Sequence, residues 1–444
     1  MKAAVVGKDG RTSAIIDSLE KTGRLCERVR YLSSGKLGAT PELREKARAE
    51  LRQNAKDFRP DFVVIGPEEP LVDGFVDILR DEFGIPCVGP TRKLAEIEAS
   101  KSYTRKLLED YGIPGNPAFR VFKETRGIEE YIESLGQYVI KPDGLTGGKG
   151  VKVSDVHLFS VPNAIAYCGE LFREGHHAVV IEEKLDGEEF SLQSIADGMN
   201  VKHMPIVQDH KRVGVGDTGP NTGGMGSYSC NDGSLPFLTR EDVENAKAIN
   251  EAVVKALRHK TGEAYKGVLY GGFIATRDGI KLIEYNVRFG DPEALNVLSL
   301  LETDFVDVCN AIIHQNLGDL EIAFSERSTV CKYLVPDGYP DNPDKDGQVD
   351  LSRLPTQSPN LRIFEAALEE RGGKKFLTGS RAIAIVGIAD ELDAAEKIAE
   401  EAAKSVGGPV YHRPDIGSRE LIESKVDHMR RVRIGKLRPS ALIQ

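Results

Sequence analysis

KPDGLTGGKG, at residues 141–150, is the stretch from which the interpretation of this chain starts. It sets a glycine-rich turn between two short apolar runs, 138–140 and 151–153, and this pattern predicts a β-hairpin. Glycine lets backbone N–H groups approach an anion closely, and Lys141 or Lys149 can add a full positive charge. The pattern GxxxxGK[ST] is absent, so this is not a P-loop. A phosphate cradle and an ordinary flexible hairpin explain the stretch equally well.

The composition is that of a globular protein. The 444 residues are enough for roughly three domains, and 40% are hydrophobic and 29% charged. The net charge of −10 argues against a nucleic-acid or membrane surface, because such surfaces depend on an excess of Lys and Arg. The six cysteines are scattered without CxxC pairs, which indicates neither a zinc site nor a disulfide framework, so we expect a reducing cytoplasm.

Strands and helices alternate over the first hundred residues. Apolar runs at 3–6 and 62–65 predict buried strands, and 12–22 and 71–82 have the apolar spacing of helices. This βαβα pattern predicts a parallel sheet with ligands at the carboxyl ends of its strands. Residues 7–11, GKDGR, lie at such an end, where either a phosphate cradle or a plain tight turn fits.

The next stretch is predicted as one helix over 92–111, with Lys101 near its middle as either a solvated charge or a ligand contact. Residues 119–134 are interpreted as a linker that carries a charged amphipathic helix. A buried strand at 179–181 then leads into glutamates, and a second strand follows at 190–196. Residues 181–185 with Glu189 could hold a nucleotide base and ribose, or they could be acidic residues on a hairpin turn.

The polar, glycine-dense segment 209–226 has no periodicity, so it is predicted as a loop. Such loops are either solvated linkers or binding loops. The charged cluster at 209–212 in an acidic protein favours binding. Within it, His210 could act as a catalytic base, as a positioning residue or simply as a satisfied hydrogen-bond partner.

Residues 281–289, KLIEYNVRF, alternate with a period of two. The alternation places Glu284, Asn286 and Arg288 on one face of a predicted strand, roughly 6–7 Å apart. Carboxylate and amide oxygens in this arrangement suit Mg²⁺, which keeps phosphate oxygens and waters as its other ligands. An exposed polar face would give the same pattern, but a phosphate cradle upstream favours the metal site.

After about residue 325 the pattern changes to that of a small α+β domain. Strands are predicted at 330–335 and 381–386, and an alanine-rich helix at 391–406. Arg413 and Asp415 could border a cleft, and the Arg-rich tail from residue 429 is predicted to be peripheral.

Taken together, these segments resemble the phosphoribosylamine–glycine ligase (glycinamide ribonucleotide synthetase) family of the ATP-grasp superfamily over nearly the whole chain. The segments that carry the resemblance are IGPEEPLVDGFVDILR at 65–80, VGPTRKLAEIEASK at 88–101, VIKPDGLTGGKGV at 139–151, VIEEKLDGEEFS at 180–191, QDHKRVGVGDTGPNTGGMGSYS at 208–229, GVLYGGF at 267–273, IEYNVRFGDPEA at 283–294 and the weaker YHRPDIGSR at 411–419. The segments at 208–229 and 283–294 are the most specific, whereas either glycine loop alone would identify little.

The resemblance implies a multidomain α/β and α+β protein. Its expected parts are an N-terminal parallel α/β substrate domain at 1–100, an ATP-grasp domain at 101–325 with a mobile lid at about 119–192, and a small C-terminal α+β domain at 326–435. The implied reaction joins glycine to 5-phosphoribosylamine with ATP and Mg²⁺ or Mn²⁺, giving glycinamide ribonucleotide, ADP and phosphate in purine biosynthesis. We expect a cytoplasmic monomer that binds neither nucleic acid nor membrane. The alternatives are an ATP-grasp ligase for another acid and amine, and a nucleotide-binding regulatory protein that has lost catalysis.

The resemblance also implies roles for individual residues, carried over motif by motif. ATP would be bound by Lys101, Lys141, Gly147, Gly148, Lys149, Gly150, Glu182, Glu183, Leu185 and Glu189, with the last four at the adenine and ribose. Mg²⁺ or Mn²⁺ would be bound by Glu284 and Asn286. The residues expected to be catalytic are Arg288, Asp209, Lys211 and Asp291. The substrates would be bound by Gly10, Arg11, Asp217, Thr218, Asn221, Thr222, Gly223, Met225, Pro292 and Glu293.

One departure from the family pattern lies in the first loop. The family has GxGGREHA after its first strand, whereas this chain has GKDGRTSA at 7–14. Gly10 and Arg11 are kept, but Asp9, Thr12 and Ser13 replace Gly, Glu and His. A carboxylate at Asp9 would repel a substrate phosphate, so binding of phosphoribosylamine at this loop needs a structural test.

Overall fold

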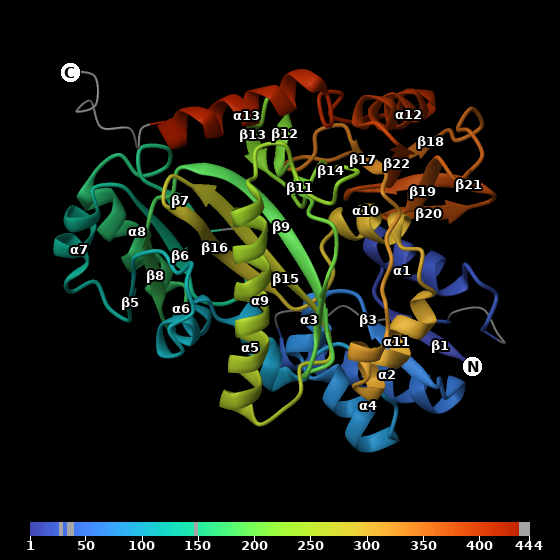
Figure 1. Ribbon diagram of the computed structural model, residues 1–444, viewed down its shortest axis with the longest axis horizontal. Helices are drawn as coiled ribbons and strands as arrows, with labels where there is room; N and C mark the ends of the chain where they lie inside the picture. Colours follow the sequence, from blue (N-terminus) through green and yellow to red (C-terminus); the bar gives the residue numbers. More distant parts are fainter. Residues whose placement is uncertain (26–29, 33–39, 146–149, 435–444) are drawn as a thin grey trace.

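The computed structural model describes residues 1–25, 30–32, 40–145 and 150–434. The chain forms an N-terminal parallel sheet, a separate outer lobe, a central antiparallel sheet and a C-terminal sheet (Figure 1). The predicted α/β and α+β multidomain class is therefore confirmed. None of the helices in these described ranges is long and apolar enough to cross a membrane.

The N-terminal sheet has the order β2-β1-β3-β4 and is parallel throughout, as the alternating pattern predicted. Its strands are β1 (Ala3–Val6), β2 (Arg30–Leu32), β3 (Phe62–Ile65) and β4 (Cys87–Val88). The helices of this part are α1 (Gly10–Glu20), α2 (Pro41–Phe58), α3 (Glu68–Val72) and α4 (Phe75–Phe83). The single helix predicted at 71–82 is wrong, because Gly74 takes a left-handed φ of 82° and separates α3 from α4.

The helix predicted over 92–111 is also two helices, α5 (Arg92–Ala99) and α6 (Lys101–Asp110). Ser100 leaves the helical region at φ −134° and ψ 115°, and its hydroxyl accepts a hydrogen bond from the Tyr103 backbone N–H. Serine is a favoured N-cap because its oxygen satisfies one of the free N–H groups of a helix start. Lys101 therefore begins α6 instead of lying in the middle of a longer helix.

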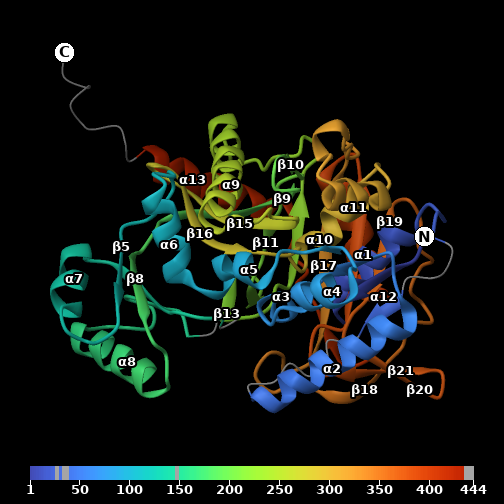
Figure 2. The ribbon, with the colours of Figure 1, turned by 90° about the horizontal axis from the view of Figure 1, so that it is seen from below.

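The outer lobe carries a four-stranded antiparallel sheet of order β5-β8-β6-β7, and its two helices, α7 and α8, contact each other (Figures 1 and 2). Its elements are β5 (Phe119–Phe122), α7 (Ile128–Leu135), β6 (Tyr138–Pro142), β7 (Lys152–Val153), α8 (Val161–Arg173) and β8 (Val179–Glu183). The predicted hairpin is confirmed, with Val139 paired to Val153. The segment 119–134 is not a linker, because it supplies an edge strand of the lobe, but the charged amphipathic helix predicted within it is confirmed as α7.

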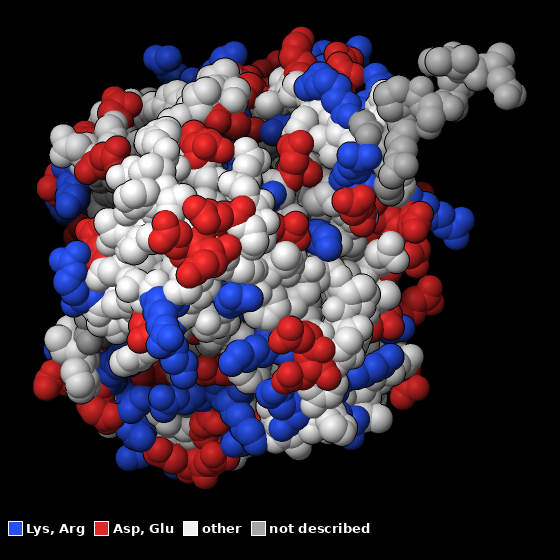
Figure 3. Space-filling view, turned by 90° about the vertical axis from the view of Figure 1, so that its left-hand side faces the viewer, with Lys and Arg blue, Asp and Glu red and all other residues white. Residues whose placement is uncertain are grey.

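The lobe has its own hydrophobic core, which includes Ile128, Ile140, Cys168 and Ile181. Figure 3 shows the side of the molecule that carries the lobe. Acidic and basic side chains are interspersed on this face, with Lys and Arg gathered toward its lower edge in the view (Figure 3). This face of the molecule therefore carries both positive and negative side chains.

The central sheet has the order β10-β9-β15-β16 and is antiparallel. Its strands are β9 (Gly187–Ala196), β10 (Val201–His203), β15 (Gly267–Thr276) and β16 (Gly279–Asn286), and the long helix α9 (Arg240–Thr261) packs on it. The strict alternation predicted for 281–289 is wrong at Ile283. A β-bulge there leaves Ile283 without a partner, because Gly272 pairs with Glu284 and Phe273 with Leu282. The strand also ends at Asn286, so Arg288 lies in the loop that follows it.

The C-terminal sheet has the order β11-β14-β17-β22-β19, with β23 added to β17. Its strands are β11 (Gln208–Asp209), β14 (Gly226–Ser229), β17 (Ser328–Pro336), β19 (Leu361–Glu365), β22 (Ile383–Ala389) and β23 (Val410–Tyr411). The segment predicted as a plain loop at 209–226 instead supplies β11, the start of β14 and a hairpin between them, β12 (Arg212–Gly214) with β13 (Thr218–Asn221). Since β14 pairs with β17, one sheet joins this segment to the C-terminal part.

The remaining elements complete the C-terminal half. They are α10 (Glu293–Leu300), α11 (Phe305–His314), the 3-10 helix η1 (Leu317–Asp319), a small sheet of β18 (Lys345–Val349), β20 (Leu368–Arg371) and β21 (Lys374–Thr378), and the helices α12 (Leu392–Ser405) and α13 (Arg419–Ile434). The predicted alanine-rich helix is confirmed as α12. The peripheral tail predicted from residue 429 is wrong for its described part, because Met429 is 1% exposed and Arg433 pairs with Asp242 of α9.

Candidate active site

A cavity of about 810 Å³ lies where the N-terminal, central and C-terminal parts meet. Its walls come from α5 and α6, from β16 and the loop after it, from the segment 209–223 and from C-terminal residues that include Arg381. The structure thus brings together side chains that lie hundreds of positions apart in the sequence. The predicted site residues that line this cavity are Arg11, Lys101, Asp209, Lys211, Asn221, Thr222, Gly223, Glu284, Asn286, Arg288, Asp291 and Glu293.

Two lysines mark the end of the cavity nearest the outer lobe. Lys101 donates to the Gly144 carbonyl at 2.8 Å, which links the start of α6 to the hairpin loop. Burial lowers the pKa of Lys101, and Glu284 opposes this shift. Lys141 lies beside the wall of the cavity, where its ammonium donates to the Ile283 carbonyl at 3.4 Å. Gly147, Gly148 and Lys149 lie outside the described residues, so their phosphate-binding role stays a prediction.

Lys141 belongs to a buried ion cluster with Glu182 and Arg105. The Glu182 carboxylate lies 2.6 Å from Arg105 Nε and 2.7 Å from Lys141 Nζ. Burial alone would raise the pKa of Glu182, but the two cations lower it. Arg105 also donates to the carbonyls of Leu282 and Ile283, two successive groups that the bulge in β16 presents on the same side. Sequence reasoning missed Arg105, although it lies one turn from Leu108 on the buried stripe of α6.

The other residues predicted at the adenine and ribose are absent from the described lining of the cavity. Glu183 accepts a hydrogen bond from the Ala118 backbone N–H at 2.8 Å, and Glu189 lies 3.4 Å from Lys211 Nζ. Leu185 is partly buried in the turn between β8 and β9, and Gly150 precedes β7 with a φ of 82°. Their contacts with a nucleotide stay predictions.

Glu284 is the carboxylate best placed to hold a metal ion. It is paired to Gly272 in the central sheet, and within the described part of the chain its carboxylate accepts no hydrogen bond. Burial would raise the pKa of Glu284, but the charges of Lys211, Lys141, Lys101 and Arg288 lower it, so the group is ionised. A carboxylate with open lone pairs, in a ring of cations that can also hold phosphates, fits a divalent cation well.

Asn286 supplies the second oxygen of the predicted metal pair. Its Oδ1 accepts from Arg288 Nη2 at 2.9 Å, so it keeps one lone pair for another partner. Among the described residues no cluster of three or more His, Cys, Asp or Glu side chains could hold a metal ion alone. The two oxygens therefore suit Mg²⁺, which is commonly bound by one or two protein groups together with substrate phosphates.

Arg288 is held in place by two acidic residues that sequence reasoning missed. Its Nε donates to Glu68 at 3.0 Å, and its Nη2 lies 3.4 Å from Glu98. Burial raises the pKa of Glu98 to about 7. Burial would raise the pKa of Glu68 as well, but Arg288 and Arg11 lower it to about 2. Both glutamates lie in the segments 65–80 and 88–101 that carried the resemblance, and this was the available signal.

Asp209 and Lys211 form an ion pair in the cavity wall. The Lys211 ammonium lies 3.7 Å from the Asp209 carboxylate, which is 8% exposed. Burial raises the pKa of Asp209 to about 6, with Lys211 acting in the opposite direction. Asp209 can therefore change its protonation state near neutral pH.

Asp291 is fixed by two groups from the C-terminal part, Tyr333 and Arg381. The Tyr333 hydroxyl donates to Oδ1 at 2.6 Å, and Arg381 Nη2 donates to Oδ2 at 2.9 Å. Next along the chain, Glu293 accepts from the Tyr270 hydroxyl at 2.8 Å. Arg381 and Tyr333 had no motif that could have revealed them, because each is an isolated residue in its own strand region.

The altered first loop is closed by its own ion pair. Asp9 caps α1 by accepting from the Thr12 backbone N–H at 2.8 Å, and its other oxygen accepts from Arg11 Nε at 3.1 Å and Nη2 at 2.5 Å. Burial would raise the pKa of Asp9, but the charge and hydrogen bonds of Arg11 and Thr12 lower it. The remaining Arg11 nitrogen, Nη1, donates to the Phe289 carbonyl at 2.8 Å. Arg11 thus has a protein acceptor at each of its three nitrogens.

Several other predicted substrate residues lie outside the cavity lining. Asp217 is 2.6 Å from Arg413 and 2.8 Å from Lys425, so it ties the β12–β13 hairpin to the C-terminal part. Arg413 is 0% exposed, which makes the predicted cleft position of Arg413 and Asp415 wrong for Arg413. The positions of the remaining four are as follows. Gly10 begins α1 against the Tyr333 hydroxyl, and Thr218 is exposed on β13. Met225 is buried, and Pro292 is the N-cap residue of α10.

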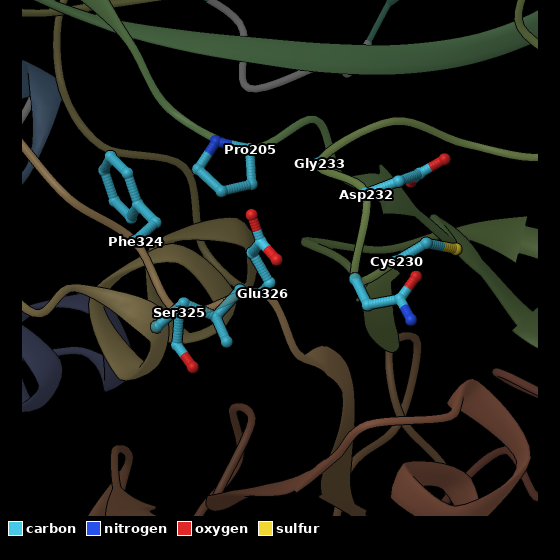
Figure 4. A pocket seen from close by; sticks show the side chains of 9 residues that line it. Pro205, Cys230, Asp232, Gly233, Phe324, Ser325 and Glu326 are labelled. Atoms are coloured by element: carbon cyan, nitrogen blue, oxygen red, sulfur yellow. The ribbon is translucent and has the colours of Figure 1, made fainter.

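A second cavity, of about 500 Å³, lies on another part of the surface. It is bordered by the turn around Gly233, by Pro205 and by the segment 324–326 (Figure 4). The Glu326 side chain extends toward Pro205, whereas Asp232 points away (Figure 4). Lysine and arginine are absent from the described residues that line it, so the larger cavity is the candidate active site.

Comparison with known proteins shows the family of the chain. The family descriptions that match are phosphoribosylglycinamide synthetase N domain at residues 1–98, ATP-grasp (A) domain at 99–294 and C domain at 329–419. The phosphoribosylamine–glycine ligase of Methanosarcina barkeri is 44% identical over 439 residues, covering 98% of this chain and 100% of the relative.

One solved structure shows the same relationship, and another shows the fold. The phosphoribosylamine–glycine ligase of Thermotoga maritima superposes with a TM-score of 0.76 at 29% identity, over 94% of this chain and 100% of that one. The biotin carboxylase domain of Hydrogenobacter thermophilus 2-oxoglutarate carboxylase, solved with MgADP, has a TM-score of 0.69 at 16% identity over 97% and 94% of the two chains, and this likeness shows the fold alone. The chain belongs to the phosphoribosylamine–glycine ligase family, in which an ATP-grasp domain is flanked by the family's N and C domains.

Proposed function

We propose that this protein joins glycine to 5-phosphoribosylamine at the expense of ATP, giving glycinamide ribonucleotide, ADP and phosphate in the purine pathway. The observation that carries the proposal is the convergence of Lys101, Lys211, Glu284, Asn286 and Arg288 on one cavity. Family membership over almost the whole chain supports the same activity. The cavity volume of about 810 Å³ is in the range of small-molecule sites.

The reaction needs an activated acid, because a carboxylate does not react with an amine at a useful rate. A glycine carboxylate oxygen attacks the γ-phosphorus of ATP, the bond to the ADP oxygen breaks, and glycyl phosphate forms. The amine nitrogen then attacks the glycyl carbonyl carbon, phosphate leaves with the C–O bond electrons, and the nitrogen loses its proton. Both steps build charge on phosphoryl oxygens, so positioned cations are the main contribution that the protein makes.

Individual residues are proposed for these tasks. Lys101 and Lys141, with the loop 147–150, hold the ATP phosphates, and Arg288 and Lys211 offset charge at the glycyl phosphate. Glu182, Glu183, Leu185 and Glu189 are proposed at the adenine and ribose. The acceptor amine is proposed to bind beside Arg11, Asn221–Gly223, Asp291 and Glu293, with Asp217, Thr218, Met225 and Pro292 supporting that end.

Glu284 and Asn286 are proposed to hold Mg²⁺ or Mn²⁺. The ion supplies charge neutralisation on the phosphate oxygens when it is bound. The open lone pairs of Glu284 and its ionised state support this role. The MgADP in the Hydrogenobacter domain supports a divalent cation in this fold. Comparing activity with Mg²⁺ and with Mn²⁺ distinguishes the two metals.

The outer lobe is proposed to act as a lid. Acyl phosphates and phosphoribosylamine both hydrolyse readily, so the site must exclude water during turnover. The lobe has a core separate from the main one, which supports movement as a unit. The hydrogen bond from Lys101 to Gly144 is one contact between α6 and the hairpin that such a movement would change.

We also propose that the protein works as a monomer in the cytoplasm. The cavity combines all three parts of one chain, which supports a site complete in a monomer. The five cysteines in the described ranges are free thiols, which supports a reducing compartment. Gel filtration at assay concentration tests the first proposal.

A phosphate-release assay tests the function. With Mg-ATP, the protein should release phosphate only when glycine and freshly made phosphoribosylamine are both present. Phosphate release without glycine, or with a different carboxylate in its place, would overturn the proposal. Omitting each substrate in turn provides the internal control.

One observation favours a second candidate, an ATP-grasp ligase whose acceptor amine lacks a phosphate. Asp9 occupies two of the three Arg11 nitrogens, and the third is bound to Phe289. Arg11 therefore has fewer N–H donors available to an anion than an arginine without protein partners would have. Comparing phosphoribosylamine with ribosylamine as acceptors in the same assay separates the two candidates.

A further inference from the structure

Arg381 connects the C-terminal part to the wall of the cavity through four hydrogen bonds. It precedes β22, and its side chain is 15% exposed at the cavity surface. Its Nη1 donates to the carbonyls of Gly223 at 2.7 Å, Gly224 at 3.1 Å and Asp291 at 2.8 Å. Its Nη2 donates to the Asp291 carboxylate at 2.9 Å. One guanidinium thus binds two separate segments of the central part at the same place.

The glycines of the 223–224 segment allow this close packing. A Cβ on Gly223 would lie 3.2 Å from Arg381 Cζ. Gly224 has a φ of 110°, and a Cβ there would lie 2.7 Å from the Pro292 side chain. The segment therefore lies directly against the arginine and against the turn that begins α10. Larger residues at either position would push the segment away from Asp291.

Tyr333 completes the arrangement from the C-terminal sheet. The Arg381 guanidinium carbon lies 4.5 Å from the centre of the Tyr333 ring, and the tyrosine hydroxyl donates to Asp291 at 2.6 Å. Tyr333 is fully buried, so its ring and hydroxyl are fixed by the surrounding core. Stacking and hydrogen bonding together restrict Arg381 to one orientation.

This arrangement lies beside the residues that the proposed function assigns to the acceptor amine. Asn221, Thr222, Gly223 and Asp291 line the same cavity as Arg381. Arg381 Nη1 donates to three carbonyls and Nη2 to one carboxylate, and these contacts make the residue a support for the wall. Within the proposed function, on which this inference rests, the wall in question is the one that the phosphoribosylamine would contact.

We propose that Arg381 is a positioning residue that holds residues 221–224 against Asp291 and so sets the affinity for the acceptor amine. It acts through the carbonyls and the carboxylate that it binds, without touching the reacting atoms. Loss of Arg381 should therefore change KM for the acceptor far more than KM for ATP or glycine. A residue that only stabilised the fold would change no single KM selectively.

The test compares Arg381→Met and Arg381→Lys with wild type at saturating ATP and glycine. Arg381→Met should raise KM for phosphoribosylamine by about 10- to 100-fold, since it removes several charge-assisted hydrogen bonds. KM for ATP should change by less than about 3-fold, and Arg381→Lys should recover part of the loss because it keeps the charge. Equal changes in all three KM values, or a fall in kcat alone, would overturn the inference.

Arg327→Met is the matched control. Arg327 also lies in the C-terminal part and binds the Ile388 carbonyl of β22 and Asn360, but it does not line the cavity. Its replacement should leave every KM within about 2-fold of wild type, because its weak surface contacts lie outside the cavity lining. A rise in acceptor KM equal to that of Arg381→Met would show that any loss from the C-terminal part has this effect.

Tyr333→Phe keeps the inference testable if Arg381→Met does not fold. It keeps the ring beneath the guanidinium and removes the hydrogen bond to Asp291. It should raise the same KM by a smaller factor, about 3- to 10-fold. An unchanged acceptor KM in this folded variant would contradict the inference. If the wild-type protein releases no phosphate that depends on glycine and the amine, the proposed function is wrong. That result is distinct from an unchanged acceptor KM in an active variant, which contradicts the role of Arg381.

Discussion

Replacing Glu182 with glutamine should destabilise the contact between the outer lobe and the rest of the protein. Glu182 lies on β8 of the lobe, whereas its partner Arg105 lies on α6 and also binds carbonyls of β16. The cluster of Glu182, Arg105 and Lys141 therefore links the lobe to α6 and the central sheet in this conformation. Glutamine keeps the size of the side chain and removes only its charge.

The size of the effect follows from the burial of the cluster. Arg105, Glu182 and Lys141 have side chains that are 2%, 4% and 10% exposed. Removing one member of a buried ion pair leaves the other charge uncompensated and costs about 3–5 kcal/mol. The glutamine oxygen still accepts one hydrogen bond from Arg105, so we expect the lower end, about 3 kcal/mol.

Urea unfolding followed by circular dichroism measures this loss. The chain has no tryptophan, so fluorescence would report weakly on the transition. With a slope of about 3 kcal/mol/M, a loss of about 3 kcal/mol lowers the urea midpoint by about 1 M. If the lobe unfolds separately, an earlier transition should appear in the variant alone.

Glu183→Gln is the control, because it makes the same charge change one residue along. Glu183 accepts one hydrogen bond from the exposed Ala118 backbone N–H, so its loss should cost about 1 kcal/mol or less. The reasoning fails if Glu182→Gln unfolds at the wild-type midpoint. Should it also raise KM for ATP selectively, Glu182 contacts the nucleotide as the sequence predicted, and its ion pairs are secondary.

Three further changes test other parts of the site. Asp9→Asn keeps the helix cap but removes the charge that pairs with Arg11, so KM for phosphoribosylamine should fall by about 10-fold in steady-state assays; a rise would show that the pair is needed for binding. Glu284→Gln should weaken Mg²⁺ binding in the presence of an ATP analogue by about 10-fold or more in calorimetric titration, and wild-type affinity would place the ion elsewhere. Glu98→Gln should flatten the dependence of unfolding free energy on pH. Because burial raises the pKa of Glu98 from 4.5 to about 7, the folded state binds this proton more tightly, and the wild-type contribution, present below pH 4.5, is lost as pH rises through about 7. The difference is about 3 kcal/mol between pH 4.5 and 8, and equal slopes for variant and wild type in urea unfolding would contradict it.

Local patterns were sufficient for much of the fold. The runs at β1 and β3 are fully buried because each is apolar at every position, and that is visible in four consecutive residues. The hairpin of β6 and β7 follows in the same way from apolar runs around a glycine-rich turn. In each case the deciding interactions lie within a few residues, which is the range that periodicity describes.

The failures share a physical cause, which is the preference of a residue for a distant partner over the local pattern. Ser100 breaks a helix that the apolar spacing continues, since its hydroxyl caps α6 and also contacts Asp143. The bulge at Ile283 is stabilised by Arg105, and neither position predicts the other. The segment 209–226 was interpreted as loop although its last residue begins β14, because the pairing of β14 with β17 joins residues about a hundred positions apart.

The site shows the same division. The predicted metal pair and lysines lie in short motifs, and the structure places Lys101, Lys211, Glu284 and Asn286 in one cavity. Asp217 and Met225 lie in an equally specific motif, yet they support the hairpin and the buried layer behind the cavity. A motif thus identifies a segment near the chemistry, and only the packing separates contact residues from supporting ones.

The loop after β16 is held by both the N-terminal and the C-terminal parts of the chain. From the N-terminal part, Arg11 donates to the Phe289 carbonyl, and from the C-terminal part, Arg381 donates to Asp291 two residues later. Arg288, which faces the proposed transferring phosphate, directly precedes these two anchors. A shift of the N-terminal or the C-terminal part would therefore move Arg288 relative to Glu284 and Asn286. Displacements of about 1 Å can cost about 100-fold in rate. The proposed chemistry therefore depends on the anchoring of this loop by Arg11 and Arg381 as much as on the charge of Arg288.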